Sequence, residues 1–119
     1  MKISDAEWKI MSLLWESEPM TITQLTKGLL SSTGWTKYTV MTYLKRMEEK
    51  GIVYHVAGEK AKLYYADIEK DEAMIHEKNN FLTKVFKGNA ALMISTMVEY
   101  NELSEEEIDK LIEILEKKR

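Results

Sequence analysis

The sequence predicts a mainly α-helical fold with one short β-hairpin, and two patterns predict it. Ser or Thr followed three residues later by Glu or Gln marks a helix start, and this pattern occurs at Ser4, Thr21 and Ser104, each flanked by apolar residues. Two runs of β-branched and aromatic residues, 52–56 and 62–66, are separated by a glycine-containing segment, which is typical of a hairpin. The chain has 119 residues, about one domain by length, and can bury its own core.

Three helices are expected before the hairpin, over 5–16, 22–30 and 37–50. Pro19 stops the first, because proline disfavours helical geometry in the residue before it. The segment 31–34 ends the second in a turn. Thr36 caps the start of the third, and Gly51 supplies a left-handed cap at its end. Together they predict a three-helix cluster.

Three more helices are expected after the short candidate linker 67–70: one from Glu69 to a stop at 87–89, one over 90–100, and one that opens at Ser104. Fifty residues in three helices make a poor independent core. We therefore expect a domain boundary between 68 and 69, and a region 69–119 that packs against a second copy. The residues expected at this dimer interface are Phe81, Leu82, Val85, Phe86, Met93, Met97, Leu111 and Leu115.

Composition excludes several classes of protein. There is no cysteine, so disulfides and thiolate metal sites cannot form, and we expect neither a metal nor a cofactor. The first residues carry charges and no signal-peptide apolar run, and no window approaches the roughly 20 apolar residues of a membrane span. A soluble, cytoplasmic protein without direct membrane binding is expected.

Catalysis is not expected. His55 and His76 are the only histidines, and neither has a Ser or carboxylate at a diagnostic spacing. Glycine-rich phosphate loops are also absent. The acidic run 105–107 could suggest a metal site, but acids are favoured in the first turn of any helix.

The net charge of −3 is unevenly distributed. Residues 1–68 hold nine Lys/Arg against eight Asp/Glu, whereas 69–119 hold eight against twelve. Within 36–66 there are six bases (Lys37, Lys45, Arg46, Lys50, Lys60, Lys62) against three acids (Glu48, Glu49, Glu59). This local excess favours a polyanionic partner for the third helix and the hairpin.

The third helix has two distinct faces at 100° per residue. Its core stripe is Val40, Tyr43, Leu44 and Met47. Its outer face is Tyr38, Met41, Thr42 and Lys45, with Thr39 and Arg46 at the edge. Threonine hydroxyls can serve bases or phosphates, Met41 and the threonine methyls can touch a thymine methyl, and Lys45 or Arg46 can reach guanine or phosphate.

A polar helix face is ordinarily only solvated. Here the helix follows a capped helix and a glycine-containing turn and precedes a hairpin, which is the order of a winged helix-turn-helix DNA-binding domain. The residues expected to contact DNA are Thr36, Lys37, Tyr38, Thr39, Met41, Thr42, Lys45 and Arg46 on the helix, and Lys60 and Lys62 on the hairpin.

The two hairpin lysines are expected to meet the phosphate backbone or an adjacent minor groove and to raise affinity without selecting sequence. For Lys62 the alternative is an edge-strand lysine that guards against aggregation. Trp8, Trp15 and Trp35 are interpreted as core or capping residues rather than base-stacking platforms.

Several segments together resemble the penicillinase repressor family (BlaI/MecI/CopY type): ISDAEWKIMSLLW, MTITQL, WTKYTVMTYLKRMEEKG, GEKAKLYY, FLTKVFKGNAALMIS and ELSEEEIDKLIEIL. The resemblance covers nearly the whole chain. It implies a homodimeric winged-helix repressor that binds an inverted-repeat DNA operator of inducible resistance or stress genes. For several members it also implies induction by a membrane sensor metalloprotease that responds to a β-lactam.

The chain departs from the family pattern in three places. The family often has proline at the position of Lys37 and a basic residue at Tyr38 and Met41, so we expect a modified operator. Its cleavage junction is Asn-Phe, and the matching pair here is Thr96-Met97, which the resemblance gives as the candidate junction. The cysteine cluster of the copper-responsive branch is absent, so copper sensing is not expected.

A sequence-specific, dimeric repressor is thus the leading expectation. Two alternatives remain open: a winged-helix regulator controlled by a small effector rather than by proteolysis, and a winged helix that serves as a protein-interaction scaffold. The local positive charge and the polar helix face argue against the scaffold.

Overall fold

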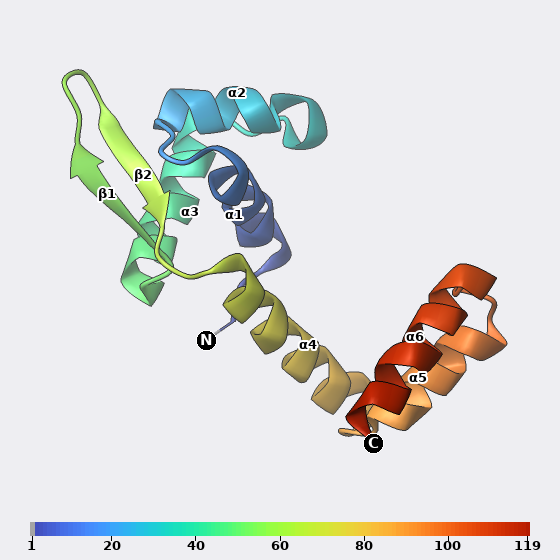
Figure 1. Ribbon diagram of the computed structural model, residues 1–119. Helices are drawn as coiled ribbons and strands as arrows, with labels where there is room; N and C mark the ends of the chain where they lie inside the picture. Colours follow the sequence, from blue (N-terminus) through green and yellow to red (C-terminus); the bar gives the residue numbers. More distant parts are fainter. Residues whose placement is uncertain (1) are drawn as a thin grey trace. The chain divides into compact units, whose positions relative to one another are not determined.

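The computed structural model describes residues 2–119 (Figure 1), which form two compact units that divide between Glu77 and Lys78. The expectation of a mainly α chain with one hairpin is confirmed. The elements are α1 (Asp5–Ser17), α2 (Ile22–Thr33), α3 (Lys37–Lys50), β1 (Val53–Ala57), β2 (Lys62–Ala66), α4 (Lys70–Phe86), α5 (Ala90–Glu99) and α6 (Glu105–Lys118). The two units divide within α4, whose Ala73 belongs to the core of the first unit. The expected domain boundary at 68/69 stays a prediction.

Helix starts lie where the capping patterns predict them. The side-chain oxygens of Ser4, Thr21 and Ser104 each accept a hydrogen bond from the backbone N–H three residues on. The backbone N–H of each cap residue in turn donates to the side-chain oxygen of the Glu or Gln at that position. Thr36 accepts from the backbone of Thr39 without a reciprocal bond. Each cap satisfies backbone donors that a helix start otherwise leaves free.

Several boundaries predicted from the sequence differ from the observed ones by one to three residues, and two of them have a clear structural cause. α2 continues to Thr33 instead of ending at Leu30, because the hydroxyls of Ser32 and Thr33 donate back to the Leu29 carbonyl and Gly34, at φ 69°, provides the left-handed cap. β1 begins one residue later than predicted. The backbone N–H of Ile52 donates to the Met47 carbonyl at 3.0 Å, so Ile52 belongs to the cap of α3.

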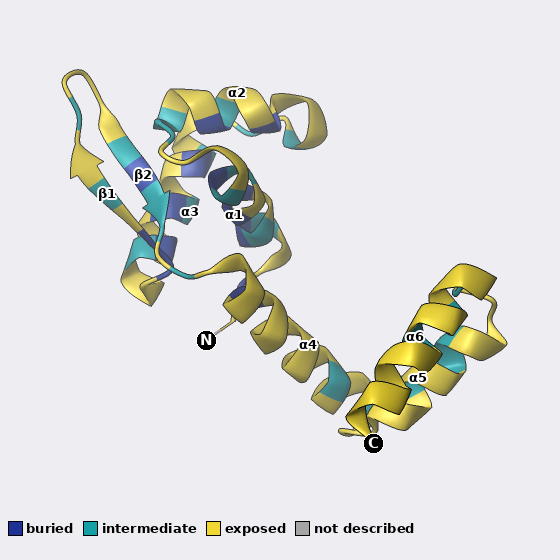
Figure 2. Cartoon of the chain, viewed as in Figure 1, coloured by how far each residue is buried: buried dark blue, intermediate teal, exposed yellow. Residues whose placement is uncertain are grey.

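The core of the first unit lies between α1, α2, α3 and the hairpin (Figure 2). Ile10, Met11 and Leu14 of α1 are fully buried, and Leu25, Val40, Leu44, Met47 and Ile52 join them. All three tryptophans pack against this core and are partly buried. Trp15 also donates from Nε1 to the Ile68 carbonyl at 3.0 Å. The interpretation of the tryptophans as core residues is thereby confirmed.

Glu7 is the buried charged residue of this core, with 2% of its surface exposed. Its Oε1 accepts from the Ser4 backbone at 2.9 Å and lies 2.5 Å from Lys50 Nζ. Burial by itself raises the pKa of Glu7, but the hydrogen bonds from Lys50 and Ser4 together outweigh it and leave the pKa lowered. The ion pair therefore fastens the end of α3 to the start of α1.

The second unit leaves large apolar side chains uncovered. No side chain of α5 or α6 is buried. Of the expected dimer-interface residues, Phe81, Val85 and Leu115 are about half exposed, and Leu82, Phe86, Met93, Met97 and Leu111 are half-buried. Across residues 2–119, the helices are too short or too polar to cross a membrane.

Candidate nucleic-acid interface

α3 turns its core stripe inward, as the sequence predicts. Val40, Leu44 and Met47 are at most 1% exposed. Tyr43 is partly buried, and its ring lies 5.0 Å from that of Trp35, centroid to centroid. Because one side of the helix is sealed against the core, the other side must face outward.

The outer face of α3 is correspondingly open. Tyr38 is 81% exposed and Met41 48%, and Thr42 and Lys45 are exposed beside them. The remaining predicted contact residues on this helix differ in exposure. Thr36, Lys37 and Arg46 are exposed, whereas Thr39 is half-buried, with its hydroxyl 3.3 Å from that of Thr36.

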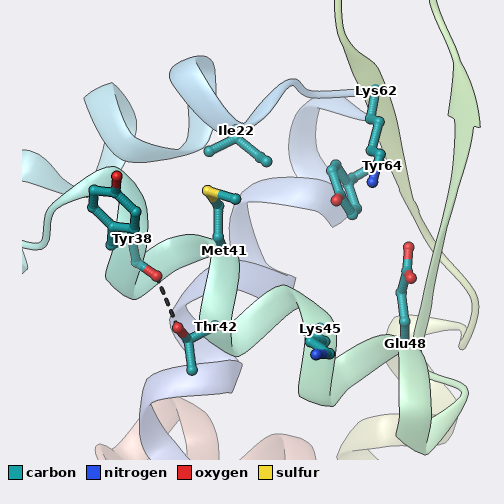
Figure 3. A pocket seen from close by; sticks show the side chains of 8 residues that line it. All are labelled: Ile22, Tyr38, Met41, Thr42, Lys45, Glu48, Lys62 and Tyr64. Atoms are coloured by element: carbon teal, nitrogen blue, oxygen red, sulfur yellow. Dashed lines mark hydrogen bonds between the residues drawn. The ribbon is translucent and has the colours of Figure 1, made fainter.

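The outer face of α3 meets the hairpin across a groove of about 420 Å³ (Figure 3). We call it the α3–wing groove. Its lining residues are Tyr38, Met41, Thr42, Lys45 and Glu48 of α3, Ile22 of α2, and Lys62 and Tyr64 of β2. The structure thus brings together the four outer-face residues and Lys62, which the sequence places in two separate segments.

The hairpin tip is tightly turned. β1 and β2 pair antiparallel, with Ala57 opposite Lys62, and the Gly58 backbone donates to the Ala61 carbonyl at 2.9 Å. A Cβ on Gly58 would lie 2.4 Å from that carbonyl oxygen, so the turn requires glycine. Lys60 is exposed in this turn, and Lys62 is exposed at the first position of β2.

Two contacts, neither foreseen from the sequence, hold the hairpin in place. The backbones of Met20 and Tyr64 exchange hydrogen bonds of 3.1 and 2.9 Å, which attach β2 to the α1–α2 connection. His55 Nδ1 of β1 pairs with Glu48 Oε1 of α3. The His55 ring also lies 5.3 Å from that of Tyr64, and burial, followed by the charge of Glu48, raises the pKa of the Tyr64 phenol.

The charge pattern near α3 needs one correction. From the sequence, Lys50 is expected to be one of the bases that surround the candidate interface. The structure instead places its Nζ on Glu7 and on the Lys2 carbonyl, at 2.5 and 2.8 Å. Lys45, Arg46, Lys60 and Lys62 form no salt bridge within the described residues 2–119. These four cations are available to a partner.

A metal site would need several ligand side chains close together. Across residues 2–119, His, Asp and Glu do not gather in groups of three or more that could hold a metal ion. The arrangement that remains is an exposed helix face with a cationic hairpin beside it, and such a face fits the major groove of duplex DNA.

The sequence model of the penicillinase repressor family matches residues 3–117. The chain belongs to this family. The methicillin resistance regulatory protein MecI of Staphylococcus aureus strain N315 is 29% identical over 117 residues, which are 98% of this chain and 95% of MecI. The penicillinase repressor of Bacillus licheniformis is 29% identical over 115 residues, 97% of this chain and 90% of that protein. Members are DNA-binding transcriptional repressors, which are not enzymes.

Solved structures agree with this membership. The DNA-binding domain of the repressor BlaI superposes with a TM-score of 0.54 at 27% identity, over 60% of this chain and 87% of that one. Monomeric Bacillus licheniformis BlaI in complex with the blaP half-operator superposes with a TM-score of 0.54 at 26% identity. The match covers 60% of this chain and 88% of that chain. The regulator MepR superposes with a TM-score of 0.54 over 98% of this chain and 77% of its own. At 22% identity, this likeness shows the fold alone. The predicted winged-helix fold and the family resemblance are confirmed.

Proposed function

We propose that this repressor binds an inverted-repeat operator as a homodimer and reads each half-site with the outer face of α3. The α3–wing groove carries the proposal, because it joins an exposed helix face to a cationic wing. In this proposal Thr36, Lys37, Tyr38, Thr39, Met41, Thr42, Lys45 and Arg46 lie in or beside the major groove, and Lys60 and Lys62 lie on phosphates. The BlaI half-operator complex supports the use of this domain on DNA.

Dimer formation is proposed for the second unit. Its apolar residues lack a covering partner in the described chain: Val85 is 51% exposed and Leu115 58%. Large apolar side chains that stay half exposed favour an interaction surface. A second copy fits it best, because a two-fold dimer would present two identical α3 helices to an inverted repeat.

The regulated genes are proposed to be inducible resistance or stress genes, as the names of the relatives suggest. A membrane sensor metalloprotease is the proposed inducing partner, and the repressor is proposed to act on DNA in the cytoplasm. The candidate junction Thr96-Met97 lies inside α5, where both residues are half-buried and the Thr96 hydroxyl donates to the Leu92 carbonyl at 2.8 Å. Cleavage there requires local unwinding of α5.

The proposed function is tested by gel shift of the full chain on fragments from upstream of its own gene and on random duplex of equal length. We expect binding to both that weakens with salt, and binding to one upstream fragment that survives competition by excess random DNA. Equal affinity for all fragments would contradict a sequence-specific repressor. Salt-insensitive or absent binding would contradict a DNA-binding role.

A further inference from the structure

The threonine hydroxyls near the start of α3 are occupied within the helix. Thr42 Oγ1 donates to the Tyr38 carbonyl at 2.9 Å, drawn as the dashed line in Figure 3. The hydroxyls of Thr36 and Thr39 lie 3.3 Å apart and bond to each other, and that of Thr36 also accepts from the Thr39 backbone. The Thr42 hydroxyl proton is thus already used, so this side chain can offer a ligand its methyl group and an acceptor oxygen but no donor.

The apolar side chains of Met41 and Ile22 line the α3–wing groove. Met41 is 48% exposed, and in Figure 3 its side chain points toward Ile22 across the groove. The cations Lys45 and Lys62 lie to one side of Met41, and the Tyr38 ring lies to the other. A base edge that approaches between them meets the Met41 thioether, and the exposed Thr42 lies on the same face of α3.

Only one base offers a matching group in the major groove. The C5-methyl of thymine is the single apolar substituent on the four base edges, whereas guanine, adenine and cytosine present hydrogen-bonding groups there. A threonine methyl and a methionine can bury that methyl. They cannot replace the bidentate donors that a purine edge would need.

We propose that Met41 and Thr42 select thymine in each half-site through its C5-methyl group. This inference rests on the proposed function, since it needs α3 in the major groove. It divides recognition into two parts: Met41 and Thr42 set the base at the centre of the helix footprint, and Lys45 and Arg46 contact the flanking guanines or phosphates.

The test uses deoxyuridine, which keeps every hydrogen-bonding group of thymine and lacks only the methyl. Each thymine of an operator selected from genomic DNA is replaced singly on both half-sites, and affinity of the full chain is measured. We expect a loss of roughly three- to tenfold at one or two positions per half-site, as burial of one methyl implies. Thymines outside the half-sites serve as controls and should show none.

A matched pair of variants assigns the effect to its side chain. Thr42→Ser keeps the hydroxyl bond to Tyr38 and removes the methyl, so it should reduce the thymine-to-deoxyuridine ratio. Thr42→Val keeps a methyl and removes the hydroxyl, so it should preserve that ratio. Met41→Ala should also reduce it. Because Met41 and Thr42 are exposed, far-ultraviolet circular dichroism is expected to show that all three variants fold.

The outcomes separate the two claims. Sequence-specific binding with equal affinity for thymine and deoxyuridine at every position would overturn the inference and leave the proposed function standing. A ratio that is the same in Thr42→Ser, Met41→Ala and the unmodified chain would also overturn it. Failure to select any operator would overturn both claims.

Discussion

Lys45 lies on the outer face of α3 and Arg46 at its edge, and both are exposed. We expect Lys45→Ala and Arg46→Ala to weaken operator binding, by roughly 1–3 kcal/mol where a base contact is lost. Titration of a labelled operator at physiological salt measures the change. Lys118→Ala, which removes the same charge from the end of α6, is the control. Unchanged affinity in both α3 variants would rule out this face as the recognition surface.

Glu7 and Lys50 bear on stability rather than on DNA. The folded-state pKa of Glu7 is below its usual value of 4.5, so its carboxylate stabilises the fold above that pH and the contribution is lost as pH falls through the lowered value. Lys50→Met removes the partner cation from a buried carboxylate and should cost roughly 1–3 kcal/mol at pH 7. Urea unfolding measures this cost, which should shrink as the pH falls and Glu7 becomes protonated.

The exposed Lys9 of α1 provides the matched control for that experiment, since Lys9→Met removes a lysine charge from the same unit without touching Glu7. A loss of stability in Lys50→Met that is equal at pH 7 and at pH 3.5 would show that the ion pair does not cause it.

Side-chain roles that follow from helical spacing could be predicted from the sequence. The stripe of Val40, Leu44 and Met47 is buried as its spacing requires. The pairs Lys50–Glu7 and Glu48–His55 could not be predicted, because they depend on where the end of α3 meets other elements. The hydrogen bond of the Thr42 hydroxyl could not be predicted either, since a threonine in a helix can donate to a backbone carbonyl of the same helix or to a partner molecule.

At the scale of elements, helix starts are predictable and helix ends less so. A capping box is made by residues three apart, so Thr21 and Ser104 fix their helices by local chemistry alone. The serines and threonine at 31–33 can end a helix by forming a turn, or can extend it when their hydroxyls donate to backbone carbonyls of the preceding helical turn. The structure shows the second outcome, which extends α2 toward the turn that precedes α3.

The wing is the element whose contribution should be independent of sequence. Lys60 and Lys62 lie at its exposed tip. Lys60→Ala and Lys62→Ala should each weaken binding to operator and to random duplex by about the same factor, and each should lower the slope of log affinity against log salt by about 1. Affinities on both duplexes over a range of salt concentrations measure this. Glu59→Gln, in the same turn, should leave the slope at least as steep.

A loss confined to the operator would show that the wing contacts bases rather than phosphates. No loss on either duplex would favour the alternative in which Lys62 only protects a strand edge.

At the scale of the whole molecule, we propose that the first unit binds DNA and the second unit forms the dimer. Val85→Lys and Leu115→Lys place charges on half-exposed apolar positions, so they should disrupt a dimer while the monomer still folds. Sedimentation equilibrium should show a shift from dimer to monomer. Operator affinity should fall toward that of a single half-site, because the second α3 is no longer tethered. Glu116→Lys, on the exposed side of α6, is the control.

If Val85→Lys and Leu115→Lys remained dimeric, with unchanged operator affinity, the second unit would not be the dimer interface. From the sequence, this surface could be predicted only because the region 69–119 has more apolar residues than its own core can bury. The sequence of one chain does not show which partner covers them.

The central claim is that two α3 helices read one inverted repeat, and a hydroxyl-radical footprint of the full chain on its selected operator tests it most directly. We predict two protected segments related by two-fold symmetry, with centres one helical turn or a small multiple of it apart, and both lost with Lys45→Ala and Arg46→Ala combined. A single asymmetric footprint, or a symmetric one that survives those substitutions, would contradict the claim.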